Sequence, residues 1–192
     1  NSLYKDKQGE LWILTWTGGL YKHNKTTGTF AQYPPIGIHN NPFWMLQDKE
    51  GRFWIATWGD GLFIFDPEEK EEDKMYRPLN IMNRKLEIPE TTFFNLAQDD
   101  LFGYVWALGY NEMHAFDLSE SGEIKQVDIS TVIDKNKMFS RLHKSTDGNI
   151  WLGAWDVGYN LFFEESNIKS YPLPSIKEDI GFDANILCLY KD

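Results

Sequence analysis

A chain of 192 residues is long enough for one ordinary domain. Hydrophobic residues make up 42% of it and aromatic residues 16%, which excludes a disordered chain, because this much apolar surface can form a core. The formal net charge is −10 and no segment is dense in Lys or Arg, so nucleic acid is not expected as a partner, since its phosphates would be repelled.

Four segments of the sequence share one pattern, in which a Gly precedes a Trp by three residues and an aromatic residue follows that Trp by four. The anchor tryptophans are Trp12, Trp54, Trp106 and Trp151, at spacings of 42, 52 and 45 residues. This period, with short apolar strands and Gly-rich turns, is typical of four-stranded β-propeller blades. The sequence therefore predicts an all-β fold of four antiparallel four-stranded blades that form part of a larger propeller.

Each repeat divides into four predicted strands in chain order. An inner strand such as residues 43–46 leads through an Asp-x-x-Gly turn into the Trp strand, which is continuously apolar because both of its faces pack on neighbouring blades. A Gly turn then leads to a third strand such as residues 62–65, and an outer strand ends near residues 30–33 or 168–171. We expect the third hairpin to be one residue short, since Met113 comes one place earlier than Leu62 in its repeat.

The predicted blades cover about residues 1–35, 36–85, 86–130 and 131–175. A fifth repeat is expected to start within residues 183–192, because residues 189–192 repeat residues 3–6 word for word. Four blades rarely close a ring, and the chain starts at Asn1 without an initiator Met or a signal sequence, so we expect a segment of a longer array. Residues 67–90, with the charged run 68–73, predict a solvated insertion between the second and third blades.

The wording of the repeats resembles a known family. Residues 54–66, preceded by Asp48 and Gly51, resemble the two-component regulator propeller repeat, and residues 11–21 are similar to it as well. The resemblance covers about four repeats, although the third repeat lacks the Gly-Gly turn and has Asn111-Glu112 instead. It implies the periplasmic sensor region of a hybrid two-component regulator, typical of polysaccharide-degrading gut bacteria.

The same resemblance implies a mechanism and a location. The sensor would bind a carbohydrate fragment outside the inner membrane, and a histidine kinase on the same polypeptide would signal inside. It also implies a homodimer through the sensor region, with membrane contact only through other parts of the parent polypeptide. No kinase motif and no apolar run of membrane-spanning length is present in the sequence, and the single Cys188 does not decide the compartment.

The anchor tryptophans are best explained as packing between blades, with each indole N–H reaching a strand carbonyl. The Asp residues that begin the turns, namely Asp6, Asp48 and Asp100, are expected to cap the backbone N–H groups of the turn. Their spacing lacks the dense oxygen ligands of a calcium site.

A second aromatic series sits at the turn between the second and third strands of each repeat. Its members are Trp16, Trp58, Tyr110 and Trp155. These turns share a face of a propeller with the loops that enter the inner strands, where His39 and Asn41 lie. Aromatic rings beside amides and hydroxyls suit the apolar faces and the hydroxyls of an oligosaccharide, so these six residues are the candidate ligand-binding face. The alternative is that the aromatic side chains only fill gaps at the blade edge.

Two other functions stay open. Residues 145–151 faintly resemble the Asp-box of sialidases, and carboxylate pairs for glycoside hydrolysis or lyase chemistry could come from separate blades. However, Arg52 is expected in a turn on the opposite face, and the four histidines have no metal-type spacing. We therefore predict no catalytic residue, no metal site and no cofactor in this segment. The other open function is a protein-interaction scaffold without a small ligand.

Overall fold

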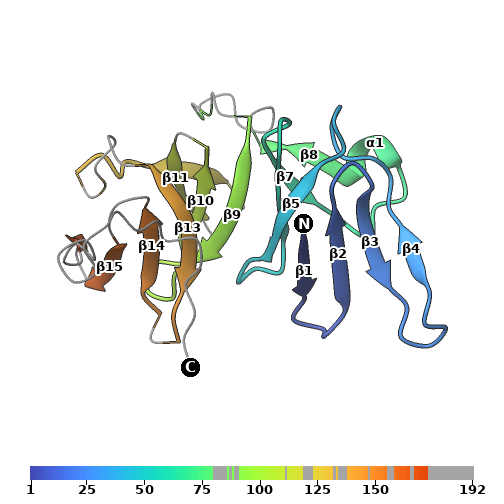
Figure 1. Ribbon diagram of the computed structural model, residues 1–192, viewed down its shortest axis with the longest axis horizontal. Coiled ribbons are helices and arrows are strands. Elements are labelled where there is room, and N and C mark those ends of the chain that lie inside the picture. Colours follow the sequence, from blue (N-terminus) through green and yellow to red (C-terminus); the bar gives the residue numbers. More distant parts are fainter. Residues whose placement is uncertain are drawn as a thin grey trace, which may run out of the picture. The chain divides into compact units, whose positions relative to one another are not determined.

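The computed structural model describes residues 1–79, 86, 88, 91–110, 112–118, 123–131, 133, 138–146, 148–154, 158–164 and 167–172. It divides into two compact units, Asn1–Leu96 (unit 1) and Ala97–Asp192 (unit 2). The described part of the chain forms four antiparallel sheets of four strands each, with the strands of every sheet in sequence order (Figure 1). The predicted all-β fold of four-stranded antiparallel blades is thereby confirmed. No helix among the described residues is long and apolar enough to cross a lipid bilayer.

The strands have the following bounds. Sheet 1 consists of β1 (Ser2–Lys5), β2 (Leu11–Thr15), β3 (Gly19–His23) and β4 (Phe30–Gln32). Sheet 2 consists of β5 (Pro42–Gln47), β6 (Phe53–Thr57), β7 (Leu62–Phe65) and β8 (Tyr76–Pro78), with a short helix α1 (Glu72–Met75) before β8. Sheet 3 consists of β9 (Phe93–Gln98), β10 (Val105–Gly109), β11 (Met113–Leu118) and β12 (Ile124–Val127). Sheet 4 consists of β13 (Phe139–Lys144), β14 (Ile150–Ala154), β15 (Gly158–Glu164) and β16 (Asn167–Pro172).

The core of unit 1 lies between sheets 1 and 2. Trp12 of β2 is fully buried and contacts Tyr33 at 5.3 Å, Phe53 at 5.6 Å and, edge-on, Phe65 at 5.6 Å between ring centroids. The ring of Phe65 stacks in turn on Tyr76 at 5.0 Å. Each such aromatic pair contributes roughly 0.5–1.5 kcal/mol beyond the area that it buries. The first anchor tryptophan therefore packs between two blades, as predicted.

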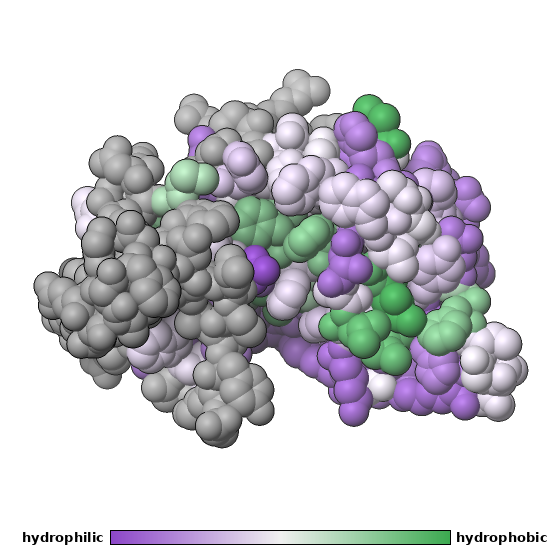
Figure 2. All heavy atoms as spheres, in the orientation of Figure 1, coloured by the Kyte–Doolittle hydropathy of each residue, from purple (hydrophilic) through white to green (hydrophobic). Residues whose placement is uncertain are grey.

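The Trp strands differ in how much of them is buried. All residues of β6 and β10 are buried, as expected for a strand covered on both faces. Strand β2 alternates instead, with Trp12 and Leu14 fully buried and the residues between them half-buried. On the other face of sheet 1, Leu3 is 70% exposed, and Figure 2 shows apolar surface over β1 and β2. Among the three Trp strands whose burial is described throughout, β6 and β10 are thus buried on both faces and β2 is not.

In the first three repeats, the indole N–H groups of the anchor tryptophans bind side-chain carboxylates. Nε1 of Trp12 donates to Oδ2 of Asp6 at 2.9 Å, and Nε1 of Trp54 donates to Oδ2 of Asp48 at 2.8 Å. The predicted carbonyl acceptor was wrong, because a carboxylate at the preceding turn offers a charge-assisted hydrogen bond that a carbonyl cannot match. The same carboxylates accept turn N–H groups, from Glu10 for Asp6 and from Arg52 for Asp48, so their predicted capping is confirmed.

In the third repeat the capping residue is Asp99, and the prediction of Asp100 was wrong. The carboxylate of Asp99 is fully buried and accepts from Nε1 of Trp106 at 3.1 Å, seven residues away instead of the six of the earlier repeats. It also accepts backbone N–H groups of Phe102, Gly103 and Tyr104. The side chain of Asp100 is half-exposed and pairs with Lys144. The turn before the Trp strand is one residue longer in the third repeat, so the capping aspartate lies one position earlier in the sequence.

The predicted insertion at 67–90 contains an outer strand. Its charged run lies at the surface, but α1 and β8 follow at once, and Met75 and Tyr76 are buried in the core of unit 1. Backbone pairing of Phe65 with Tyr76 completes sheet 2. The high charge of residues 68–73 made the strand β8 hard to recognise in the sequence. The buried aromatic residue that docks this strand is Tyr76.

The third hairpin is one residue shorter than the second, as predicted. The N–H of Thr57 donates to the carbonyl of Gly61, whereas the N–H of Gly109 donates to the carbonyl of Glu112. The shorter loop accounts for the early position of Met113 in the sequence.

The two adjacent aspartates of the third repeat give a matched test of these assignments. Asp99→Ala removes the acceptor of four donors, among them the buried indole N–H of Trp106, so we expect a loss of about 3 kcal/mol in the free energy of unfolding. Asp100→Ala removes a surface ion pair with Lys144 and should cost below about 1 kcal/mol. Urea unfolding measures both, and equal losses would contradict the assignment.

Alkaline pH should destabilise the fold through Tyr76. Burial raises the pKa of its hydroxyl, with a smaller contribution from Tyr33, and the hydroxyl has no hydrogen-bond partner among the described residues. Between the unfolded pKa of about 10 and the raised pKa of the folded state, Tyr76 ionises only in the unfolded chain. The free energy of unfolding is therefore unaffected by this group below about pH 10 and falls by about 1.4 kcal/mol per pH unit above it.

Tyr76→Phe should therefore leave stability at pH 7 unchanged or raised and should reduce the loss between pH 10 and 11. The control is Tyr4→Phe, whose hydroxyl accepts from the N–H of Gln47 at 2.7 Å, so this variant should already lose about 1 kcal/mol at pH 7. Urea unfolding at both pH values decides it. The interpretation fails if Tyr76→Phe shows the same alkaline loss as the unsubstituted chain.

Candidate functional site

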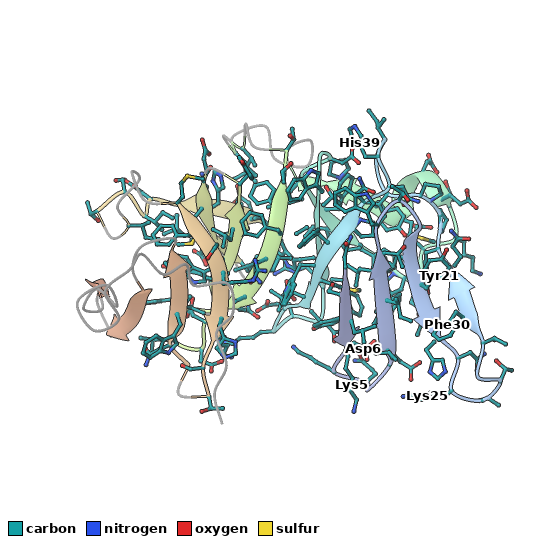
Figure 3. All side chains as sticks on the ribbon, viewed as in Figure 1. Lys5, Asp6, Tyr21, Lys25, Phe30 and His39 are labelled. Carbon is teal, nitrogen blue, oxygen red and sulfur yellow. The ribbon has the colours of Figure 1, made fainter. Side chains whose placement is uncertain are left out.

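Three loops meet at one end of unit 1. They are the β2–β3 loop at residues 16–18, the segment 36–41 that leads into β5, and the β6–β7 loop at residues 58–61. In Figure 3 the labelled His39 lies at one end of the sheets, and Lys5, Asp6 and Lys25 lie at the other. The predicted candidate residues of the first two repeats therefore belong to the end of the sheets opposite to the capped turns.

An aromatic cluster occupies this end of unit 1, and it consists of Trp16, Phe43 and Trp58. The rings of Trp16 and Trp58 are 5.8 Å apart between centroids, and those of Phe43 and Trp58 are 5.9 Å apart. Trp16 is 51% exposed and Trp58 is 37% exposed. Two neighbouring tryptophans this far exposed are unusual, because large aromatic side chains are normally buried unless they contact a partner.

Asn41 holds the two tryptophan-bearing loops together. Its Oδ1 accepts the backbone N–H of Thr17 at 2.7 Å, and its backbone carbonyl accepts the N–H of Trp58 at 3.0 Å. The residue is buried, with 7% of its surface exposed, and Thr17 has a positive φ of 59° that this contact stabilises. Asn41 was predicted to contact ligand, and the structure places it beneath the aromatic cluster, where it positions the loops.

Asp60 organises the remaining loop. Its carboxylate accepts the backbone N–H of Ile38 at 3.1 Å and of His39 at 2.8 Å, and it lies 3.0 Å from Nδ1 of the His39 ring. The Asp60 side chain is 7% exposed, whereas that of His39 is 55% exposed. A Cβ on Gly37 would come within 2.5 Å of the carboxylate carbon, so only glycine permits this approach. The sequence reasoning missed Asp60, although its position in the Gly-Asp-Gly turn was the available signal.

The segment before β9 closes the β6–β7 loop from the other side. The carbonyl of Thr91 accepts the N–H of Gly59 at 3.0 Å and of Gly61 at 2.7 Å, and Trp58 forms a bridge with Thr92. Hydrogen bonds from both neighbouring segments thus fix the backbone of Trp58. A rigid aromatic platform of this kind loses little entropy when a ligand stacks on it.

The other predicted candidates lie elsewhere in the chain. Tyr110 is 53% exposed in the β10–β11 loop of unit 2. Trp155 lies outside the described residues. Unit 1 therefore brings together four of the six predicted residues, which are Trp16, His39, Asn41 and Trp58.

Three observations bear on the catalytic and metal-binding alternatives. Within the described ranges, no group of three or more His, Cys, Asp and Glu side chains could hold a metal ion. Arg52 pairs with Asp48 in the turn before β6, as its predicted place on the opposite face requires. Asp147, the acidic residue of the faint Asp-box, lies outside the described residues.

Comparison with known families gives one match. Residues 37–59 match the family described as "two component regulator propeller". The match begins in the segment that carries His39 and Asn41 and ends just beyond Trp58. A comparison with curated proteins finds no match. The resemblance of the second repeat to this family is thereby confirmed.

Solved structures with a similar fold include two extracellular domains from B. thetaiotaomicron. That of BT4673, described as a hybrid two component system, has 19% identity and a TM-score of 0.68 over 90% of this chain and 24% of its own. That of BT3049, described in the same way, has 17% identity and a TM-score of 0.67 over 91% and 23%. Virginiamycin B lyase from Staphylococcus aureus has 15% identity and a TM-score of 0.64 over 90% and 55%.

These likenesses define the fold. At such low identities they carry no information on ligand or activity. The chain spans about a quarter of the length of the two B. thetaiotaomicron domains. The chain thus consists of blades of a β-propeller, and residues 37–59 of its second blade match the two-component regulator propeller family.

Proposed function

We propose that this chain is part of the extracytoplasmic, periplasmic sensor propeller of a hybrid two-component regulator, and that it binds an oligosaccharide. The observation that carries the proposal is the exposed pair of Trp16 and Trp58, held by hydrogen-bonded loops at one end of unit 1. The family match at residues 37–59 and the extracellular domains with the same fold support the sensor assignment.

The chemistry of the aromatic cluster favours a sugar. An indole ring presents a flat face of negative electrostatic potential, and the C–H groups on one side of a pyranose ring stack well on such a face. Specificity then requires a few polar groups around the rings, and His39 and the backbone of the three loops provide them. The loops are fixed before ligand arrives, which lowers the entropic cost of binding.

Signalling follows from a difference in affinity between two states. In this proposal the sensor forms a homodimer, and a kinase on the same polypeptide reads how its two chains pack. A ligand that binds one packing more tightly shifts the population toward it, and the kinase domains move together or apart. The chain itself acts as the receiver of ligand and not as the enzyme.

The second candidate function is a protein-interaction scaffold without a small ligand. Exposed tryptophans such as Trp16 and Trp58 are also enriched at protein interfaces. The two functions differ in one measurable property, because only the sensor is stabilised by sugar.

Thermal unfolding of the chain with a panel of oligosaccharides at millimolar concentration tests the proposal. A ligand at about a hundred times its Kd adds roughly 2.7 kcal/mol, which raises Tm by several degrees. Trp58→Ala should abolish the shift, because it removes the ring that contacts both Trp16 and Phe43. The matched control is Phe30→Ala, an aromatic residue of the same unit that is 53% exposed at the opposite end in Figure 3, and it should keep the shift.

A panel that leaves Tm unchanged would favour the scaffold. A shift that survives Trp58→Ala would place the sugar elsewhere and remove the aromatic cluster from the proposal.

Chemical crosslinking of the dimeric sensor region tests the signalling step. We expect the pattern of crosslinked pairs to change when the stabilising oligosaccharide is added, because the ligand selects one packing of the two chains. Identical patterns with and without sugar would refute the signalling step and leave the binding site intact.

A further inference from the structure

Asp60 determines which ring nitrogen of His39 carries the proton. An ionised carboxylate can only accept hydrogen bonds, and Oδ1 of Asp60 lies 3.0 Å from Nδ1 of His39. Nδ1 must therefore be the donor. In a neutral imidazole the other nitrogen, Nε2, then has a lone pair and can only accept.

The backbone of the β6–β7 loop fixes the direction of the ring. A Cβ on Gly59 would meet Nδ1 of His39 at 3.0 Å and its Cε1 and Cγ at 3.4 Å, so this edge of the imidazole lies against the loop. Nε2 belongs to the other edge, and the His39 side chain is 55% exposed. Gly59 directly follows Trp58, so the imidazole of His39 and the indole of Trp58 belong to the same end of unit 1.

The charge of the three loops restricts the ligand further. Residues 15–18, 36–43 and 57–61 contain no Lys or Arg, and their one acidic residue is Asp60. Lys5 and Lys25 lie at the opposite end of the unit in Figure 3, where Lys25 pairs with Glu10. Among the described residues of these three loops, an acidic sugar would therefore find no Lys or Arg and would meet the carboxylate of Asp60.

We propose that the site selects a neutral, hydroxyl-rich oligosaccharide, with Nε2 of His39 accepting a sugar hydroxyl and Asp60 acting as the positioning residue that makes Nδ1 the proton-bearing nitrogen of the neutral ring. This inference rests on the proposed function and narrows it to one ligand class. In this proposal the hydroxyl that donates to Nε2 and the C–H face that stacks on Trp58 belong to the same oligosaccharide.

The tautomer can be measured without any ligand. Nitrogen-15 NMR of the imidazole rings at a pH where His39 is neutral should show Nδ1 protonated and Nε2 unprotonated. His23, whose ring packs on Phe30 at 5.1 Å, provides an internal reference in the same spectrum. In Asp60→Asn, where the amide can also donate, Nε2 should gain proton occupancy. A wild-type spectrum with Nε2 protonated overturns the proposal, whatever the ligand.

Binding is then measured by calorimetry with defined probes. They are neutral oligosaccharides of glucose, xylose, mannose and galactose, and oligomers of galacturonate and of glucuronate. We expect a neutral probe to bind, and His39→Ala to weaken it about tenfold, the loss of one hydrogen bond. Asp60→Asn should weaken it several-fold, and His23→Ala should leave it unchanged.

The outcomes separate this inference from the function on which it rests. Binding that Trp58→Ala abolishes but that His39→Ala and Asp60→Asn leave intact keeps the sensor and overturns the role of His39. Preference for an acidic oligomer keeps the sensor and overturns the neutral ligand class. If no oligosaccharide binds, the proposed function fails and this inference fails with it.

Discussion

The hydrogen bond between a buried indole and a buried carboxylate is the constraint on which the first three blades depend. The carboxylates of Asp6, Asp48 and Asp99 each accept the Nε1–H of the anchor tryptophan of their own repeat. Each of them also ties down the turn before the Trp strand through backbone N–H groups. A buried charge is tolerated only where several donors surround it, so turn and anchor must form together. Once the indole is fixed, its ring presents the surface on which the facing sheet packs, as Phe53 and Phe65 pack on Trp12.

Much of the fold follows from sequence periodicity, and the exceptions have local causes. The spacing of Gly, Trp and the second aromatic residue predicted four-stranded sheets, because each turn and each anchor has a fixed place in a blade. The choice between Asp99 and Asp100 could not be made from the sequence, since the third turn carries one more residue and either carboxylate precedes the Trp at a plausible distance. The strand β8 was missed because the charged run 68–73 lies just before it, and its docking depends on Tyr76 stacking on Phe65.

The candidate site was predictable in its aromatic residues and not in its framework. Trp16 and Trp58 follow their anchors at a constant interval, so the repeat itself placed them at one end of the sheets. The roles of Asn41 and Asp60 depend on contacts with loops more than 15 residues away, as for Asn41 with Thr17, 24 residues apart, and Asp60 with His39, 21 apart. No periodicity encodes such contacts. Contacts between loops of different repeats decide which polar residues are exposed to ligand and which hold the loops in place.

The closeness in sequence of each carboxylate to its tryptophan affects how such an array can evolve. The two residues are six positions apart in the first and second repeats and seven apart in the third. Gain or loss of a whole repeat by recombination therefore inserts or removes both partners together, and no buried charge is orphaned in the blades that remain. An array that changes length in this way keeps the indole–carboxylate pairs of its other blades, while the loops at the blade ends are free to diverge.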